Sequence, residues 1–379
     1  MAEADHALTV SLCTDASEFA GLGAEWNLLH RRSRAATPFQ SHAWLHSWWL
    51  SYGRTGRLRI VLVRDGDRLV AAAPLMRRLR PLPTLVPLGS ALSDFSDVLI
   101  DDASPDLADR AADALTEGLR SLARTAVIDF REARPDSAVE RVYARWRGPR
   151  RRLADSLCLE LPALPMDDLV RRLAKPRAQR ARAKMRKLDA LGIERRVVPP
   201  PEVERSVHRL LELHQLQWQG RKVTTEHLRP RFAEHLTRSV ALMAETGDAV
   251  VTEFRLDDTV VAADLTLRSP QLAGGYLYGA HPRLREQKAD VATLLLRSCA
   301  DQLRAEPLPG GATPGVLSLL RGNEPYKRHW RPHTLVNQRL LLARRRTAPQ
   351  LAALLTAAAA RSGAKRALRA WRERGDGPS

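Results

Sequence analysis

The stretch LLRGNEPYKRHW (residues 319–330) joins the end of an apolar segment to a loop that carries reactive side chains. The apolar residues over 315–320 predict a buried strand, and the glycine and proline that follow end regular structure there. In the loop, Tyr326 can donate a proton to a leaving group and Lys327 can hold a phosphate. Glu324 could orient the lysine or act as a base. The alternative for all three residues is a packing role in a solvated loop.

The segment before this loop alternates strand and helix patterns. Asp264 stands in the middle of the apolar run VVAADLTLR, where a carboxylate needs a hydrogen-bonding partner or a function. A hydrogen-bonded structural role is the alternative to a chemical one. Tyr278, one strand later, could face the same cleft. We expect strands over 193–198, 249–256, 260–267 and 274–278 and helices over 203–218, 230–246 and 291–305.

The first half of the chain shows a similar order of elements. A strand over 58–64, a tight Asp-Gly-Asp turn and a strand over 68–75 predict a hairpin between helices. We therefore expect an α+β protein with two tandem lobes, whose sheets are mixed and mainly antiparallel. The predicted divisions are 1–150 for the first lobe, 151–345 for the second and 346–379 for a basic C-terminal helical tail.

Positive charge is concentrated in three segments. The chain has a formal net charge of +18, yet residues 145–152, 171–187 and 344–374 together carry more than that excess, so the remaining residues are slightly acidic. A helix expected over 177–191 carries a basic stripe made by Arg177, Arg180, Lys184, Arg186 and Lys187. This stripe favours an RNA backbone or a polyphosphate, and a solvated helix face is the alternative.

Several classes of protein are not supported by the sequence. The three cysteines lie far apart and suit neither a disulfide framework nor a zinc site, which indicates a reducing compartment. The histidines are scattered, so we expect no metal. The N-terminus shows no secretory signal, and no apolar stretch is long enough for a membrane helix. We therefore expect a soluble, cytoplasmic protein.

Three segments together resemble a known family. PFQSHAWLHSWWLSYG with LGSALSDFSDVLI, QRARAKMRKLDALG with LLELHQLQW, and LYGAHP with LLRGNEPYKRHW occur in the order seen in double-GNAT acyltransferases of the CelD-like type. These are relatives of the FemABX peptidyl-transfer enzymes. The resemblance covers residues 19–342. It implies two GNAT-like lobes and transfer of an acyl group to an amine, with Tyr326 as acid, and with Asp264 or Glu324 as base.

The identity of the acyl donor stays open at this stage. Enzymes of the resembled family that use acyl-CoA bind its pyrophosphate at a Ser-Pro-Gly-like turn that opens a helix. This chain has Glu-Gln-Lys-Ala-Asp over 286–290, without glycine or proline. Acyl-CoA is the first expectation. Aminoacyl-tRNA, the donor of the FemABX relatives, is the alternative that would explain the basic segments. A non-catalytic scaffold that binds RNA or a partner protein is a further alternative.

The acceptor and the residues that bind the donor complete the expected site. The acceptor is a small-molecule or peptide amine, and saccharide, peptide and antibiotic-like amines are all compatible. The phosphates of an RNA donor would meet the basic stripe over 177–187. The residues expected to bind the donor near the transferred group are Lys327, Lys288, Tyr278 and Arg321.

Overall fold

A computed structural model describes residues 7–218, 224–305 and 314–360. In this part of the chain, a single 13-stranded sheet runs through the whole molecule. Its order is β1 (Thr9–Cys13), β2 (Leu58–Asp65), β3 (Arg68–Arg78), β4 (Thr84–Pro87), β6 (Val127–Ala133), β13 (His333–Leu342), β7 (Arg150–Pro162), β12 (Val316–Arg321), β11 (Leu272–Ala280), β10 (Thr259–Arg268), β9 (Ala249–Leu256) and β8 (Glu194–Val197), while β5 (Leu99–Ile100) pairs with β3. Most pairs are antiparallel, which confirms the expected α+β class with a mixed sheet.

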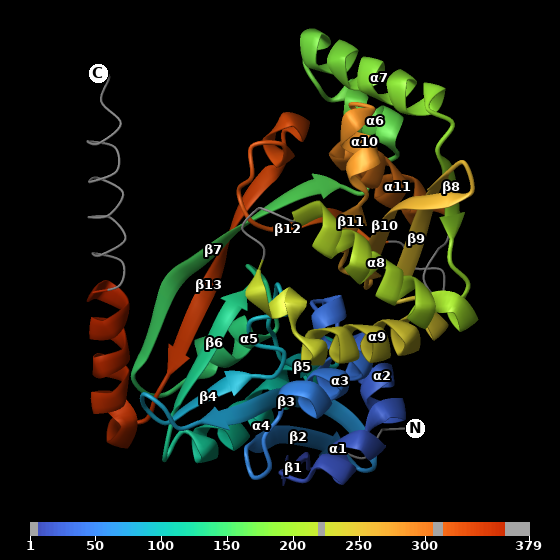
Figure 1. The fold of residues 1–379 in the computed structure, drawn as a ribbon. Helices are drawn as coiled ribbons and strands as arrows, with labels where there is room; N and C mark the ends of the chain where they lie inside the picture. Colours follow the sequence, from blue (N-terminus) through green and yellow to red (C-terminus); the bar gives the residue numbers. More distant parts are fainter. Residues whose placement is uncertain (1–6, 219–223, 306–313, 361–379) are drawn as a thin grey trace, which may run out of the picture.

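Two groups of elements flank a central ribbon (Figure 1). We call residues 7–149 the N-terminal lobe and residues 163–330 the C-terminal lobe. The helices are α1 (Ala16–Gly21), α2 (Gly23–Arg32), α3 (His42–Tyr52), α4 (Pro105–Leu122) and α5 (Val139–Arg145) in the first, and α6 (Met166–Arg171), α7 (Lys175–Ala190), α8 (Val203–Trp218), α9 (Pro230–Glu245), α10 (Pro282–Glu286) and α11 (Val291–Ala305) in the second. The helix expected over 177–191 is therefore α7.

The long strands β7 and β13 form the ribbon between the lobes (Figure 1). β13 pairs with β7 on one side and with β6 of the N-terminal lobe on the other, so the last strand among the described residues completes the N-terminal part of the sheet. The sequence patterns indicated neither β13 nor the full length of β7. Charged side chains obscured both strands. Arg339 in β13, for example, is buried because its guanidinium binds both carboxylate oxygens of Asp129 at 2.7 Å.

The basic segment 145–152 is partly a connection and partly a strand. α5 ends at Arg145 and β7 begins at Arg150, so three of its five arginines belong to a strand. Arg150 and Arg152 lie over the ring of Tyr143, with their guanidinium carbons 4.8 Å from its centroid. This cation–π packing lets a strand begin in a run of positive charge.

The two lobes share one hydrophobic core. α3 of the N-terminal lobe packs against α9 of the C-terminal lobe, and α8 packs on β10 and β11. At the junction, the ring of Trp44 lies 5.1 Å from Tyr276 and 4.6 Å from His235. The tryptophans of the segment 41–52 thus fix the position of one lobe on the other, as buried core residues.

The chain ends, within the described residues, in a helix over 348–360 that packs through Leu351 and Leu354 on the sheet beside Leu341. The basic part of the tail predicted over 346–379 lies mostly outside the described residues. None of the helices described is long and apolar enough to cross a membrane.

Candidate functional site

A large cavity lies where β11 and β12 separate. These two strands run parallel, but only the segment Leu272–Gly274 of β11 pairs with the segment Val316–Ser318 of β12. Beyond these residues the strands diverge. The space between them is a cavity of about 590 Å³. Its walls come from β10, β11, β12, α11 and the loop 321–330, with Leu92 and Asp94 contributed by the N-terminal lobe. Both lobes therefore contribute to the site.

The backbone is irregular on both sides of this opening. On β11, Leu277 pairs with Leu265 and Gly275 with Thr266, so Tyr276 is an extra residue, a β-bulge. On β12, Leu320 has a φ of 57°, a left-handed conformation that costs a branched residue on the order of 1–2 kcal/mol. Bulges and strained residues of this kind re-aim side chains and end strand pairing. Here they hold the two strands apart.

Asp264 lines the cavity from the middle of β10, as the sequence predicted. Its carboxyl is 3% exposed and accepts a hydrogen bond of 3.0 Å from the Thr266 hydroxyl. Burial raises the pKa of Asp264 to about 7, and the Thr266 bond offsets only part of this effect. A carboxyl with such a pKa would become charged when a cationic amine arrives beside it. The thiol of neighbouring Cys299 has a pKa raised to about 12 by burial, so it is not a nucleophile at neutral pH.

The loop 321–330 places three of the predicted residues at the cavity. Lys327 is 8% exposed, and its ammonium binds Glu324 at 2.8 Å and the carbonyl of Arg321 at 2.9 Å. Glu324 thus orients the lysine. Tyr326 is 45% exposed, and burial of its hydroxyl, with Tyr278 and Glu324 nearby, raises its pKa. It therefore keeps its proton at neutral pH and can donate it.

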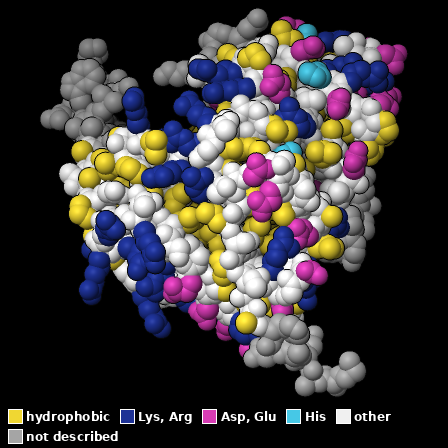
Figure 2. All heavy atoms as spheres, turned by 90° about the horizontal axis from the view of Figure 1, so that it is seen from below, with side chains coloured by type: hydrophobic (Ala, Val, Ile, Leu, Met, Phe, Trp, Pro, Cys, Tyr) yellow, Lys and Arg dark blue, Asp and Glu magenta, His cyan; other side chains and the backbone are white. Residues whose placement is uncertain are grey.

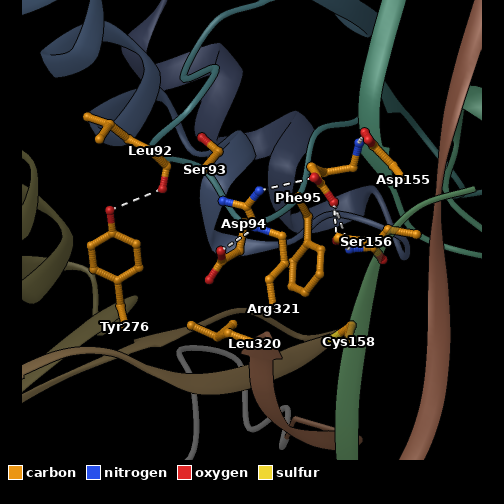
Figure 3. Close-up of polar contacts among 12 residues, drawn as sticks. Leu92, Ser93, Asp94, Phe95, Asp155, Ser156, Cys158, Tyr276, Leu320 and Arg321 are labelled. Atoms are coloured by element: carbon orange, nitrogen blue, oxygen red, sulfur yellow. Dashed lines mark hydrogen bonds and ion pairs between the residues drawn. The ribbon is translucent and has the colours of Figure 1, made fainter. Parts of the chain in front are cut away.

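Arg321 joins the C-terminal lobe to the N-terminal lobe (Figure 3). Its guanidinium donates to Asp94 at 2.6 Å and to Glu132 at 3.1 Å. In the same view, the Tyr276 hydroxyl donates to the Leu92 carbonyl at 3.0 Å. Arg321 lines the cavity, but its charge is already matched by two carboxylates. Its expected part in donor binding stays a prediction, and these contacts give it a role in holding the cavity wall.

The start of α11 is where an acyl-CoA pyrophosphate was expected. Asp290 precedes the helix, and its carboxylate accepts a bond of 2.9 Å from the Thr293 amide. It also binds the Lys184 ammonium of α7 at 2.5 Å. Burial opposes the charge on Asp290, but the bonds from Lys184 and Thr293 outweigh it and lower the pKa. Lys288, also expected to bind the donor, is exposed and does not line the cavity.

The other members of the basic stripe lie on the open face of α7. Arg177, Arg180, Arg186 and Lys187 are exposed, while Ala178, Ala181 and Leu188 face the C-terminal lobe. No ion pair holds these four cations among residues 7–218, 224–305 and 314–360. Basic side chains also gather elsewhere. Seen from below, Lys and Arg form groups at the left of the view and at its upper right (Figure 2).

Sequence reasoning missed a histidine pair at the cavity. His227, in the short helix η3 (Thr225–Leu228), lines the cavity, and its Nδ1 lies 3.3 Å from Nε2 of His214. Nδ1 of His214 lies 2.7 Å from the carbonyl oxygen of Tyr278. Neither histidine was predicted to be a site residue, because the histidines are scattered along the sequence. No motif joins them, because only the packing of α8 against β11 brings them together. Among the described residues, no cluster suits a metal ion.

Comparisons with known proteins identify a domain family and solved structures that this chain resembles. Residues 174–328 match the family model of the acetyltransferase (GNAT) domain. The whole fold is similar to FemX (TM-score 0.58, 10% identity, 88% of this chain and 96% of that one) and to L-PGS from Bacillus licheniformis (TM-score 0.52, 11% identity, 90% and 96%). A conserved protein of unknown function from Bacteroides thetaiotaomicron is also similar (TM-score 0.57, 12% identity, 89% and 100%). No curated protein sequence matches this chain.

These matches confirm the main part of the predicted resemblance. The C-terminal lobe carries a GNAT acetyltransferase domain, and the chain is an acyltransferase with a FemX-like fold. The CelD-like assignment and the roles of the individual site residues stay predictions.

Proposed function

We propose that this acyltransferase moves an aminoacyl group from aminoacyl-tRNA to the amine of a small molecule or peptide bound in the cavity. One observation carries the choice of donor. The helix end that would bind the pyrophosphate of acyl-CoA is occupied by the chain's own carboxylate, Asp290. The fold shared with FemX, and the aminoacyl-tRNA donor implied by the FemABX resemblance, support the same choice.

The argument about the helix end is electrostatic. A helix N-terminus attracts one anion through its unpaired amides, and here the Thr293 amide already donates to Asp290. A phosphate placed about 4 Å from this carboxylate would be repelled by about 4 kcal/mol at an effective dielectric constant near 20. Lys184 offsets part of this repulsion through its ion pair with Asp290, but the Thr293 amide stays bound to Asp290. A pyrophosphate is therefore a poor ligand for the start of α11.

A tRNA donor would use charge that the structure leaves open. The four exposed cations lie on α7, the helix that also carries Lys184. They are on the face of this helix that is turned to solvent. Phosphates of an RNA backbone can bind such a row of cations without entering the cavity. Only the aminoacylated end then has to reach Asp264 and Tyr326. This division fits a cavity with an apolar wall formed by α11 and the two diverging strands.

The cavity residues suit direct attack by the amine on the ester. Asp264, whose pKa is about 7, attracts a cationic acceptor and becomes charged beside it. The Tyr326 hydroxyl, whose pKa is raised, can give its proton to the ribose oxygen that leaves. Lys327, held by Glu324, adds positive charge near the donor end. Nothing in this sequence of steps requires a covalent enzyme intermediate.

The test is a transfer assay with two donors. The full chain is incubated with radiolabelled aminoacyl-tRNA or radiolabelled acetyl-CoA, and with an acceptor panel of glucosamine, free lysine and a lysine-containing peptide. We expect label to reach an acceptor from aminoacyl-tRNA and not from acetyl-CoA. Transfer from acetyl-CoA alone would overturn the choice of donor. Transfer from neither donor to any acceptor in the panel would count against the proposed activity as a whole.

Acyl-CoA remains a second candidate for one reason. The family model that matches residues 174–328 describes an acetyltransferase, and the diverging pair of β11 and β12 offers a slot for an extended donor. In that case the pyrophosphate would bind away from the start of α11. The same assay distinguishes this candidate, because it predicts label transfer from acetyl-CoA and indifference to tRNA.

A further inference from the structure

We propose that His227 is the general base of acyl transfer in the cavity and that His214 is the positioning residue that fixes its proton. The base role rests on the proposed function, but the arrangement of protons is a property of the folded chain. His227 comes from η3 and lines the cavity, whereas His214 comes from α8 and is only 6% exposed. His214 lies within the segment LLELHQLQW, but neither histidine was among the site residues predicted from the sequence.

A backbone carbonyl determines where the protons lie. The Tyr278 carbonyl can only accept, so Nδ1 of His214, at 2.7 Å, must carry a hydrogen. When the ring is neutral, Nε2 of His214 therefore carries no hydrogen and presents a lone pair. That lone pair faces Nδ1 of His227 at 3.3 Å, and two lone pairs do not bond. Nδ1 of His227 therefore carries its hydrogen, and Nε2 of His227 is left as an acceptor.

Both rings are neutral at physiological pH. Burial is the main effect that lowers the pKa of His214, and burial together with the neighbouring His214 lowers the pKa of His227 to about 4. The plane of His227 is also fixed, because its ring stacks on buried Phe232 with centroids 4.6 Å apart and planes 20° apart. The acceptor form is thus present in nearly all molecules and held in one orientation.

The charged and titratable groups around His227 come from several elements. Glu226 of η3 lies beside it and raises its pKa slightly, but Glu226 is itself bound by Arg231 of α9 and by Arg229. The groups from the other elements are His214 of α8, Tyr52 of α3, Tyr278 of β11, and Glu324 and Tyr326 of the loop after β12. None of these is an unpaired cation that would prevent protonation during the reaction.

The reaction step balances without a further reagent. The neutral amine attacks the acyl carbon, and a nitrogen–carbon bond forms. As it forms, the nitrogen becomes acidic and passes one proton to Nε2 of His227. The ester carbon–oxygen bond breaks, and the leaving oxygen takes a proton from Tyr326 or water. His227 then passes its proton through water to Tyr326, or to the solvent where water protonated the leaving oxygen, so that both residues regain their starting forms. Of the two carboxylates predicted as bases, Glu324 is held by Lys327, and Asp264 is proposed to hold the ammonium group of the acceptor.

Asparagine and glutamine variants separate catalysis from structure. In His227→Asn, the amide nitrogen takes the place of Nδ1 and keeps the bond to His214, but the base is lost. With the donor and acceptor identified in the transfer assay, we expect kcat to fall about 100-fold or more, with KM changed less than about threefold. His208→Asn, an exposed histidine on the same helix as His214, is the matched control and should keep the parent's rate.

Variants of His214 test the positioning role. His214→Gln places a carbonyl oxygen near the position of Nε2, so it can still accept from His227 and should stay within about threefold of the parent. His214→Asn keeps the bond to Tyr278 but has no acceptor for His227, and we expect a loss of about tenfold. A purely structural His214 would show no such difference between two variants of equal thermal stability.

Ring-nitrogen chemical shifts provide a readout that does not depend on activity. NMR of the full chain at neutral pH, with signals assigned from the Asn variants, should show the Nδ1–H tautomer for both His214 and His227. An Nε2–H tautomer at His227, or a His227→Asn variant with kcat within threefold of the parent, would overturn the proposal. If the parent transfers no acyl group, the base role falls with the proposed function, and the nitrogen shifts still decide whether His227 offers a lone pair to the cavity.

Discussion

The hairpin of β2 and β3 and the pair of β11 and β12 belong to the same sheet but do opposite things. Every residue of β2 pairs with β3, from Leu58 with Met76 to Asp65 with Arg68, with one register shift between Val63 and Arg64, and the hairpin buries a continuous apolar surface. β11 and β12 pair over only three residues and then separate around polar side chains. The comparison teaches that this fold is stabilised where pairing is complete and can bind substrate where pairing stops.

The largest expected effect concerns stability. Leu62 in β2 is 1% exposed and packed on all sides, so Leu62→Ala should lower the free energy of unfolding by about 2–5 kcal/mol. Leu319 in β12 borders the existing cavity, and Leu319→Ala should cost about half as much because fewer contacts are lost. Urea denaturation of the two variants measures both values. Equal losses would contradict the contrast between the packed and the open region.

The next effect concerns catalysis at the open region. Tyr326→Phe removes only a hydroxyl from a side chain that is 45% exposed, so the fold should be unchanged. We expect kcat to fall by about 100-fold, since general acid catalysis typically contributes that much. Tyr278→Phe, at the same cavity, is the matched comparison and should have a smaller effect. If Tyr326→Phe keeps full turnover with the native donor, the tyrosine is not the acid.

The buried carboxyl of Asp264 should make the stability of the protein depend on pH. Because burial raises its pKa to about 7 from 3.8, the folded state binds more protons than the unfolded state between these pH values. Stability associated with Asp264 is therefore present at low pH and lost as pH rises through about 7. Asp264→Asn should raise Tm at pH 8 by about 2 °C or more and leave it nearly unchanged at pH 4.

The same variant separates two roles of Asp264. If the carboxylate holds the ammonium group of the acceptor, Asp264→Asn should raise KM for the acceptor about tenfold and leave kcat within a few-fold. A fall in kcat alone would instead assign Asp264 the role of base. An equal Tm difference between parent and variant at pH 4 and pH 8 would contradict the raised pKa.

A smaller effect is expected at the start of α11. Asp290→Ser keeps a capping oxygen for the Thr293 amide but removes the carboxylate. We expect free CoA to bind the variant about tenfold more tightly than the parent in calorimetric titration. Asp189→Ser, which removes an acid from the far end of α7, is the control and should not change CoA binding. Tight CoA binding by the parent would contradict a closed anion site.

The sequence predicted those features that are local. The hairpin of β2 and β3 was identified because its turn and its apolar runs adjoin in the chain, and Asp264 and Tyr326 were placed at one cleft because the resemblance covered both. β13 was missed because its partners, β6 and β7, lie far away in sequence. For the same reason, the partners of charged groups were not foreseen, such as Asp290 for Lys184 and His214 for His227.

The most direct test of the tRNA donor is the salt dependence of binding. Replacing Arg177, Arg180, Arg186 and Lys187 with Gln removes the open cations of α7, and replacing Arg54, Arg78, Arg124 and Arg147 removes equal charge from exposed positions of the N-terminal lobe. If tRNA phosphates bind α7, the slope of log affinity against log salt should become shallower by about three for the first variant, at about 0.7–0.9 per contact.

The control variant should keep a slope close to that of the parent, because its arginines lie away from α7. Parent and both variants are compared by filter binding of bulk aminoacyl-tRNA from low to physiological salt. A parent slope that both variants reduce equally, or a parent affinity no higher than that of an unrelated basic protein at physiological salt, would contradict aminoacyl-tRNA as the donor.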